Sequence, residues 1–245
     1  MNIANRKILI TGASRGLGRA LVFACARSGA REVFACARQP EDIEDLQDEA
    51  SAIEAPITPI KLDVTVESDV RAAAELGFVD ILINNAGFAG YGNPLEMDYE
   101  TVAQEMNVNY FGALRMARAL APAMIERGEG MIVNVATAFA KVNLPLIGTY
   151  CASKAALLSL GQALRAYLSH QGVRVMTVMP TTIDTDMSKG ADVPKMTTEF
   201  VTAEILRHIR EETLDPPIGE EAEKLLSGLR DDPLALEKML AQIRV

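Results

Sequence analysis

The chain has 245 residues, of which 49% are hydrophobic, and its 33 acidic and 24 basic side chains give a formal net charge of −9 at pH 7. This length and composition suit one large α/β domain with a sizeable core. The negative charge argues against nucleic acid or an anionic membrane surface as a partner.

Three cysteines, Cys25, Cys36 and Cys151, are odd in number and show no metal-ligand spacing. We expect Cys25 and Cys36 to be buried thiols in a reduced, cytoplasmic protein. Residues 1–7 lack the apolar core of a signal peptide, and no stretch approaches the roughly 20 apolar residues of a membrane span. The two histidines fall near predicted helix ends or on charged faces, so we expect no metal site and no histidine-based triad.

Six short apolar runs are typical of buried parallel strands, and they occupy residues 7–10, 33–37, 57–62, 80–84, 131–135 and 173–179. Helical patterns alternate with them at residues 19–28, 41–51, 66–77, 101–127, 150–170 and 198–212. This alternation predicts an α/β fold, a Rossmann-type doubly wound parallel sheet with helices on both faces. No repeat or linker divides the chain, so we expect residues 1–245 to form a single domain.

The pattern becomes irregular after the sixth strand. Residues 181–197 have the composition of a mobile loop that could close over a site. A helical extension is expected over residues 198–245, with a turn at 215–219. Asp232 and Pro233 are typical of an N-cap and a first helical residue, and they predict one last helix.

Three glycines, Gly12, Gly16 and Gly18, directly follow the first strand. A strand, a glycine-rich turn and a helix start make an anion site, because the backbone can approach phosphates and the helix N-terminus supplies free N–H groups. The spacing Gly-x-x-x-Gly-x-Gly differs from the Gly-x-Gly-x-x-Gly dinucleotide fingerprint and from a Walker A loop. The alternative interpretation is an ordinary turn between a strand and a helix.

The second strand ends at Arg38, in the region where many NAD sites place a carboxylate for the ribose 2′-hydroxyl. An arginine suits a 2′-phosphate instead, and Arg15 inside the glycine loop could be a second clamp. Each side chain alone is also consistent with a solvated surface arginine. Together they favour NADP(H) over NAD(H).

Tyr150 and Lys154 lie four residues apart at the start of a helical pattern, so they project from one helix face. A nearby cation favours phenolate and lowers the pKa of the phenol, which makes a proton donor and acceptor usable near neutral pH. The spacing alone also fits a core tyrosine beside a solvated lysine. Position favours the first interpretation, because the unusual residues all fall at or just after the carboxyl ends of strands, where ligands bind in such sheets.

In combination and in this order, these motifs resemble the short-chain dehydrogenase/reductase family over roughly residues 6–187. The motifs that carry the likeness are the glycine loop 11–18, the Asn-Asn-Ala-Gly run 84–87, Asn109, and Tyr150 with Lys154. Asn109 and its neighbour Asn107 interrupt the predicted helix 101–127, where an asparagine usually needs a reason because its side chain competes for backbone hydrogen bonds. The resemblance implies an NAD(P)-dependent oxidoreductase that acts on a carbonyl or an alcohol.

The resemblance also implies roles for individual residues. Tyr150 would be the general acid or base, Lys154 would lower its pKa and hold the nicotinamide ribose, and Asn109 would anchor a water that relays protons to Lys154. Thr137 stands where the family usually has serine, and we expect it to take the serine's role with a more crowded hydroxyl. The implied cofactor contacts are Gly12, Ser14, Arg15, Gly16, Leu17, Gly18, Arg38, Asp63, Val64, Asn85, Ala86, Gly87, Tyr150, Lys154, Ile183 and Thr185.

Two further departures from the family pattern concern the loop and the assembly. The usual Pro-Gly after the sixth strand is Pro180-Thr181 here. The usual apolar strand that closes in Gly-Gly is missing from the C-terminal end, which puts a tetramer in doubt. We expect a homo-oligomer, with a dimer through helices 101–127 and 150–170 favoured.

The substrate is predicted from the side chains expected to face the pocket, which are mostly apolar: Phe88, Tyr91, Phe139, Val142, Leu144, Leu146, Thr182 and Met187. They indicate a small neutral, fairly hydrophobic carbonyl or secondary alcohol, and hence a carbonyl reductase. Two alternatives stay open. One is an NAD-linked secondary-alcohol dehydrogenase, and the other is a non-catalytic NADP(H)-binding regulatory module.

Overall fold

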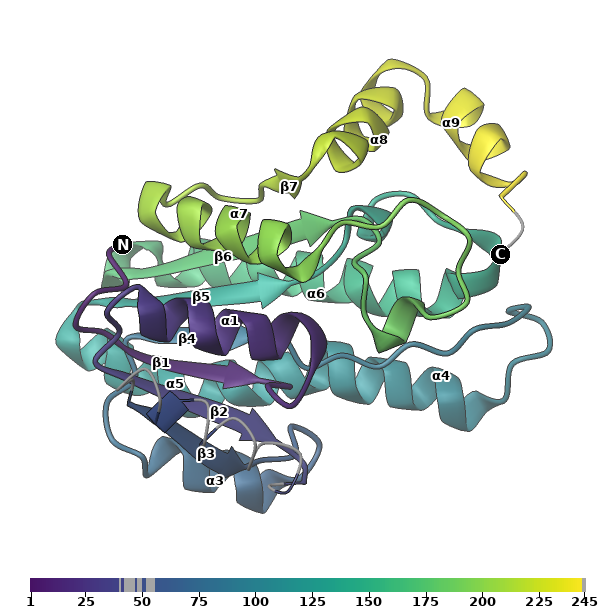
Figure 1. Ribbon diagram of the computed structural model, residues 1–245. Coiled ribbons are helices and arrows are strands. Elements are labelled where there is room, and N and C mark those ends of the chain that lie inside the picture. Colours follow the sequence, from purple (N-terminus) through teal and green to yellow (C-terminus); the bar gives the residue numbers. More distant parts are fainter. Residues whose placement is uncertain (40, 42–46, 48–49, 52–55, 244–245) are drawn as a thin grey trace.

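The computed structural model describes residues 1–39, 41, 47, 50–51 and 56–243, so the helix predicted at 41–51 lies largely outside the described residues. Within that part of the chain, seven parallel strands form one sheet in the order β3-β2-β1-β4-β5-β6-β7 (Figure 1). The strands are β1 (Lys7–Thr11), β2 (Glu32–Ala37), β3 (Ile57–Lys61), β4 (Ile81–Asn84), β5 (Gly130–Val135), β6 (Val173–Pro180) and β7 (Pro217–Ile218). The doubly wound fold predicted from the alternating pattern is confirmed.

The strand order reverses between β1 and β4, which lie side by side in the middle of the sheet. Ligands in open α/β sheets bind at such a switch point, beyond the carboxyl ends of the strands. The glycine loop after β1 and the Asn-Asn-Ala-Gly run after β4 therefore meet at this point.

The prediction of six strands with a turn at 215–219 was wrong by one strand. β7 lies inside that segment and pairs with the end of β6, with Met179 opposite Pro217 and Pro180 opposite Ile218. A two-residue strand carries no alternating pattern, and its proline is tolerated because the strand lies at the edge of the sheet. The sequence therefore contained no signal for it.

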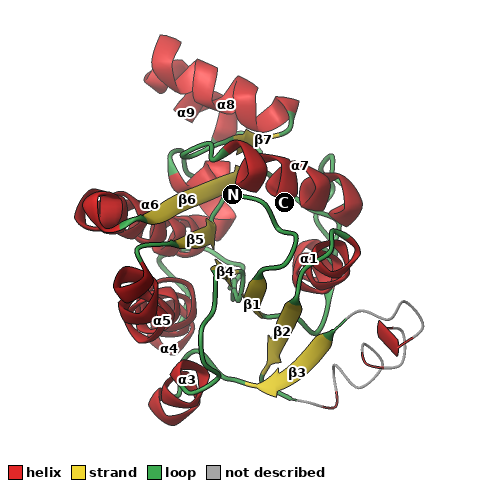
Figure 2. Cartoon of the chain, turned by 90° about the vertical axis from the view of Figure 1, so that its left-hand side faces the viewer, coloured by secondary structure: helices red, strands yellow, loops and turns green. Residues whose placement is uncertain are grey.

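The sheet is covered on both faces, and Figure 2 shows α1 and α7 on one side with α3, α5 and α6 on the other. The helices are α1 (Gly16–Arg27), α3 (Glu67–Ala74), α4 (Tyr99–Met106), α5 (Ala113–Arg127), α6 (Gly148–Leu168), α7 (Thr198–Glu211), α8 (Glu220–Asp231) and α9 (Pro233–Leu240). Alternate residues of β1 serve the two layers, because Ile8 packs with Leu21 of α1 and Leu9 packs with Met116 of α5. Cys25 and Cys36 are buried, as predicted.

The predicted helix 101–127 is helical throughout but is not one α-helix. Between α4 and α5, residues Asn107–Gly112 form a π-helical segment. Arg115 donates from Nη2 to the Asn107 side chain at 2.9 Å, so this asparagine is satisfied within the same helix. The two asparagines that interrupt the apolar pattern thus mark a π segment, a feature that often lies at functional sites.

The C-terminal helices α8 and α9 arch away from the sheet and return towards the segment that follows β5 (Figure 1). Leu236 and Leu240 of α9 are buried in one cluster with Leu144. Asp232 caps α9 as predicted, accepting a hydrogen bond from the Ala235 backbone N–H at 3.0 Å. Among the described residues, no helix has the length and apolarity needed to cross a membrane.

Shortening Leu240 tests whether α9 is held by this cluster. The side chain is 2% exposed, so Leu240→Ala should lower the free energy of unfolding by about 2–5 kcal/mol, measured by urea denaturation. Met239→Ala is the matched control. Met239 is adjacent to Leu240 but is 53% exposed, so its loss should change stability by less than about 0.5 kcal/mol. Equal effects of the two substitutions would contradict the packing of α9.

Candidate active site

The glycine loop is held to the end of β4 by a small hydrogen-bond network. Thr11 Oγ1 accepts from the backbone N–H groups of Asn85 and Ala86, each at 3.0 Å. In return, Asn85 Nδ2 donates to the carbonyls of Thr11 and Gly12 at 2.9 and 3.0 Å. The Asn85 side chain, expected to line the cofactor, is therefore committed to the loop backbone, and it fixes the position of the loop.

Two glycines of the loop are required by its geometry. Gly12 has a φ of +67°, and a Cβ there would lie 2.8 Å from the Ala86 Cα. A Cβ at Gly18 would lie 2.0 Å from the Gly12 carbonyl oxygen, so α1 begins directly against the loop. No side chain caps the start of α1. Its first N–H groups therefore point to the position where an anion binds at a helix N-terminus.

Gly87, Asn109 and Lys154 converge, although they come from three separate parts of the chain. A Cβ at Gly87 would lie 3.5 Å from Asn109 Oδ1 and 3.6 Å from Lys154 Nζ. Asn109 is fixed on both sides, because it accepts from the Phe88 N–H at 2.9 Å and donates to Ser153 Oγ at 2.8 Å. Its side chain thus joins the π segment to α6 and to residues 85–98, the connection between β4 and α4 that we call the strand-four loop.

Tyr150 and Lys154 share one face of α6, with Lys154 Nζ 5.8 Å from the centre of the Tyr150 ring. Lys154 is only 4% exposed and donates to the Val135 carbonyl at 2.8 Å. Burial lowers the pKa of Lys154 to about 8. The lysine is thus a core residue at the end of β5, which excludes the alternative of a solvated lysine.

The sequence predicted a lowered pKa for Tyr150, and in the folded chain by itself this direction is wrong. Burial raises the pKa of Tyr150, and nearby Cys151, Tyr91 and Glu105 raise it further. The helix spacing predicts the neighbouring cation but gives no information on how much water the folded chain removes from the phenol. In this structure removal of water dominates, and the neutral phenol is favoured.

Thr137 lies at the end of β5, where the family resemblance places it. Its buried hydroxyl donates to the Pro180 carbonyl at 2.9 Å and accepts from the Phe139 N–H at 3.3 Å. The hydroxyl proton is therefore engaged with the end of β6. A substrate oxygen at this site would have to compete with Pro180 for that proton.

The irregular loop 181–197 contacts two other loops of the site. A Cβ at Gly16 would lie 3.1 Å from Thr185 Cγ2, and Arg15 pairs with Asp186 at 3.5 Å. On the other side, the Tyr91 hydroxyl donates to the Met187 carbonyl. The loop therefore contacts the glycine loop and the strand-four loop at once. Within it, Ile183 forms a bridge to Met196.

Several predicted cofactor residues use their side chains elsewhere. Leu17 and Val64 are buried in the two main core clusters, so only their backbones could face a cofactor. Asp63 accepts from the backbone and the hydroxyl of Thr65 at 2.8 and 2.7 Å. Arg38 is exposed at the end of β2, and Ser14 is partly exposed in the glycine loop.

The predicted wall of the substrate pocket needs correction. Leu144 is buried in one cluster with α9, so it does not line an open pocket as expected, whereas Phe139 and Val142 are only partly buried against this cluster. The sequence pattern could not show that α9 packs against this segment. Phe88 and Met187 remain partly exposed beside Tyr91, and these side chains form the apolar mouth of the site.

Two residues of the site were missed in the sequence. Ser153 receives the Asn109 amide and donates to the Tyr150 carbonyl at 2.7 Å. Glu105 is completely buried and accepts from the Gly90 N–H at 2.8 Å. The signal for Glu105 was its spacing, because it precedes Asn109 by four residues and so shares its helix face.

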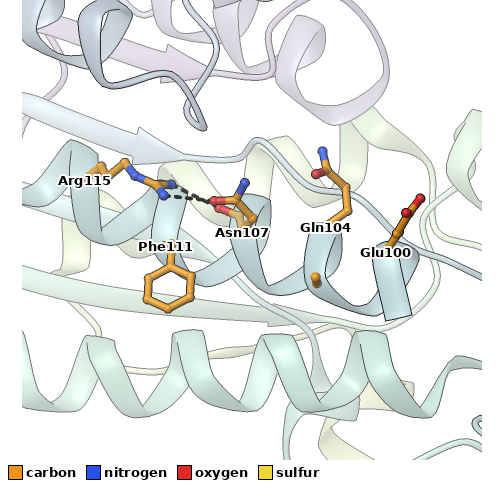
Figure 3. Close-up of a pocket in the computed structure, with 6 residues that line it drawn as sticks. Glu100, Gln104, Asn107, Phe111 and Arg115 are labelled. Carbon is orange, nitrogen blue, oxygen red and sulfur yellow. Dashed lines mark hydrogen bonds between the residues drawn. The ribbon is translucent and has the colours of Figure 1, made fainter. Parts of the chain in front are cut away.

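A separate hollow of about 370 Å³ lies on the outer side of α4 and α5 (Figure 3). It is lined by Glu100, Ala103, Gln104, Asn107, Phe111 and Arg115. None of the predicted site residues lines it, so we do not assign the chemistry to this hollow.

The residues present fit a nicotinamide dinucleotide. The uncapped start of α1 and the glycine loop suit its pyrophosphate. Arg15 and Arg38 suit a further phosphate, and Gly87 leaves room beside the Lys154 ammonium.

Comparison with known proteins identifies the family. A family model described as short chain dehydrogenase matches residues 6–194. Dehydrogenase/reductase SDR family member 7B of Bos taurus is 34% identical over 200 residues, which cover 77% of this chain and 61% of that protein. L-xylulose reductase of Cavia porcellus is 34% identical over 191 residues, covering 77% of this chain and 76% of that protein.

A solved structure is similar over almost the whole chain. The short chain dehydrogenase from Burkholderia cenocepacia J2315 in complex with NADP is 36% identical, with a TM-score of 0.92 and coverage of 99% of this chain and 100% of that one. This chain belongs to the short-chain dehydrogenase family, as the motifs in its sequence indicated. The match spans about three fifths of the length of the bovine relative.

The buried Lys154 predicts a pH dependence of stability. Its pKa falls from 10.5 to about 8 on folding, so between these values the unfolded chain binds a proton that the folded chain lacks. Stability from this group therefore rises with pH across that window, by up to about 3 kcal/mol. Urea denaturation at pH 7.5, 8.5 and 9.5 should show this rise in the wild type relative to Lys154→Met. If the difference in unfolding free energy between the wild type and Lys154→Met does not change with pH, the lowered pKa of the buried Lys154 is contradicted.

Proposed function

We propose that this protein is an NADP(H)-dependent oxidoreductase acting on a neutral carbonyl or secondary alcohol, with Tyr150 as general acid and base. The observation that carries the proposal is the convergence of Gly87, Asn109 and Lys154. It places the Tyr150–Lys154 face of α6 beside the strand-four loop, which is itself bound to the glycine loop.

Each residue has a defined part in the proposed reaction. When bound, the cofactor supplies or accepts the hydride. Tyr150 donates its phenolic proton to the carbonyl oxygen in reduction and takes it back in oxidation. Lys154, held by the Val135 carbonyl, stabilises the phenolate that remains. Asn109 holds α6 and the strand-four loop in register, so the phenol and the loop keep their relative positions.

The preference for NADP(H) rests on Arg15 and Arg38. Both are exposed at the carboxyl ends of neighbouring strands, where each could pair with a 2′-phosphate. The similar structure from Burkholderia cenocepacia contains NADP, which supports the same cofactor here.

The substrate class rests on the mouth of the site. Phe88, Tyr91 and Met187 offer apolar surface, which suits a neutral molecule rather than an anion. L-xylulose reductase and the sorbitol dehydrogenase of Cereibacter sphaeroides, which is 35% identical over 198 residues, are named for neutral substrates. This supports a neutral carbonyl.

We also propose that two copies associate through the outer faces of α4 to α6. Tyr99, Phe111 and Tyr167 expose large apolar side chains on these helices. Burying such surface in a second copy would be favourable.

Replacing Tyr150 tests the reaction directly. NADPH oxidation would be followed by absorbance with a panel of neutral aldehydes and ketones. Tyr150→Phe should lower kcat/KM by at least about 100-fold, because the proton donor is lost, while NADPH binding measured by fluorescence stays unchanged. Thr137→Ser is run beside it and should retain turnover. Unimpaired reduction by Tyr150→Phe would refute the assigned role. Tight NADPH binding without turnover of carbonyls, or of alcohols with NADP, would instead favour the binding-module alternative.

Replacing Arg38 tests the cofactor preference. Arg38→Ala should raise the Kd for NADPH by about 10- to 100-fold, because a charge-assisted contact to a phosphate is worth about 1.5–3 kcal/mol. The Kd for NADH should not change. Arg31→Ala is the matched control, since Arg31 is an exposed arginine at the other end of β2. An equal loss for both cofactors, or wild-type preference for NADH, would favour the NAD-linked alternative.

A further inference from the structure

Glu105 is a buried carboxylate that the proposed reaction does not use. It is 0% exposed on α4, and its Oε1 accepts from the Gly90 N–H at 2.8 Å. Its second oxygen, Oε2, is buried and has no hydrogen-bond partner. A buried carboxylate with one free oxygen is costly, so a stable fold retains it only where its charge is compensated.

The topology indicates what Glu105 faces. The crossovers β4-to-β5 and β5-to-β6 join parallel neighbouring strands, so α4 and α6 run in the same direction. Asn109 on this helix is hydrogen-bonded to Ser153 of α6. A Cβ at Gly90 would lie 3.4 Å from Glu105 Oε1 and 2.6 Å from Met97 Cε. Thr149 Oγ1, in the first turn of α6, donates to Met97 Sδ at 3.3 Å, so Glu105 and this turn are both close to the segment 90–97.

The first turn of α6 is a favourable place for a negative charge. No side chain caps the start of this helix, and its first turn contains no acidic residue. The positive end of the helix dipole would therefore stabilise a negative charge close to this turn. The same turn contains Tyr150 and Cys151, and Glu105 raises the pKa of both groups.

Glu105 also positions the loop that forms the mouth of the site. Together with Asn109, which binds both the N–H and the carbonyl of Phe88, it fixes the chain from Phe88 to Gly90. The next residue, Tyr91, donates to Met187 of the irregular loop. The two side chains on one helix face thus fix the segment that meets the substrate.

We propose that Glu105 is a positioning residue of the active site: its buried carboxylate fixes the loop at Gly90 and holds a negative charge near the first turn of α6, where Tyr150 lies. The charged and titratable groups around the phenol are Glu105 on α4, Cys151 and Lys154 on α6, and Tyr91 on the strand-four loop. Lys154 stabilises the phenolate, whereas the negative charge of Glu105 disfavours it. This inference rests on the proposed role of Tyr150.

The test removes the charge and keeps the hydrogen bond. Glu105→Gln still offers an oxygen to the Gly90 N–H. With the negative charge gone, phenolate forms more easily, so the Tyr150 titration should move to lower pH. It would be followed by NMR of protein labelled with ¹³Cζ-tyrosine and saturated with NADP, with Tyr150→Phe to assign the signal. In activity measurements, the pH at which the rate of carbonyl reduction begins to fall should decrease by the same amount.

Two further variants separate charge from structure. Glu100→Gln removes an exposed carboxylate from the same helix and should leave the titration in place, because solvent screens that charge. Glu105→Asp keeps the charge with a shorter reach, so it should keep the wild-type titration while KM rises. Identical Tyr150 titrations in the wild type and Glu105→Gln would overturn the inference.

The NMR titration needs no turnover, so it is independent of the substrate panel. A shifted titration in a protein that reduces no carbonyl would support the placement of Glu105 while the proposed function fails. Turnover with an unshifted titration would leave the proposed function intact and remove the role of Glu105.

Discussion

The hydrogen bonds between Thr11 and Asn85 join the ends of the two strands between which the sheet reverses its order. Each residue binds the backbone of the other's loop, so the glycine loop and the strand-four loop move as one unit. Gly12 then lies against Ala86, and α1 starts directly against Gly12. This contact therefore sets the position of α1, and also the position of Gly87 beside Lys154.

Much of the fold and the centre of the site could be predicted, because both depend on strong local patterns. A short apolar run followed by small or polar residues predicts a buried parallel strand and a ligand edge at its end. That reasoning brought Tyr150 and Lys154 to the ligand edge, and the family resemblance added Asn109. Only the folded chain shows how they are joined, because Ser153, which links Asn109 to Tyr150, carries no pattern of its own.

What could not be predicted depends on long-range packing. The direction of the Tyr150 pKa follows from how much water the folded chain excludes, which spacing on one helix does not contain. The burial of Leu144 depends on α9, almost one hundred residues later in the chain. β7 exists because β6 offers an open edge, and its two residues carry no strand pattern. In each case a distant segment decides the environment of a local motif.

The π-helical segment Asn107–Gly112 has a consequence for the way this chain tolerates changes in length. It contains one residue more than an α-helix would need, and its wider turn absorbs that residue, so α4 and α5 keep the relative orientation of one continuous helix. Loss of one residue other than Asn109 from this segment would therefore restore regular α geometry and leave Met116 and Leu120 in the core. The same loss within α4 or α5 would turn the two ends of the helix by about 100° relative to each other. This helix should therefore tolerate a change of length in its π segment better than in the α-helices on either side.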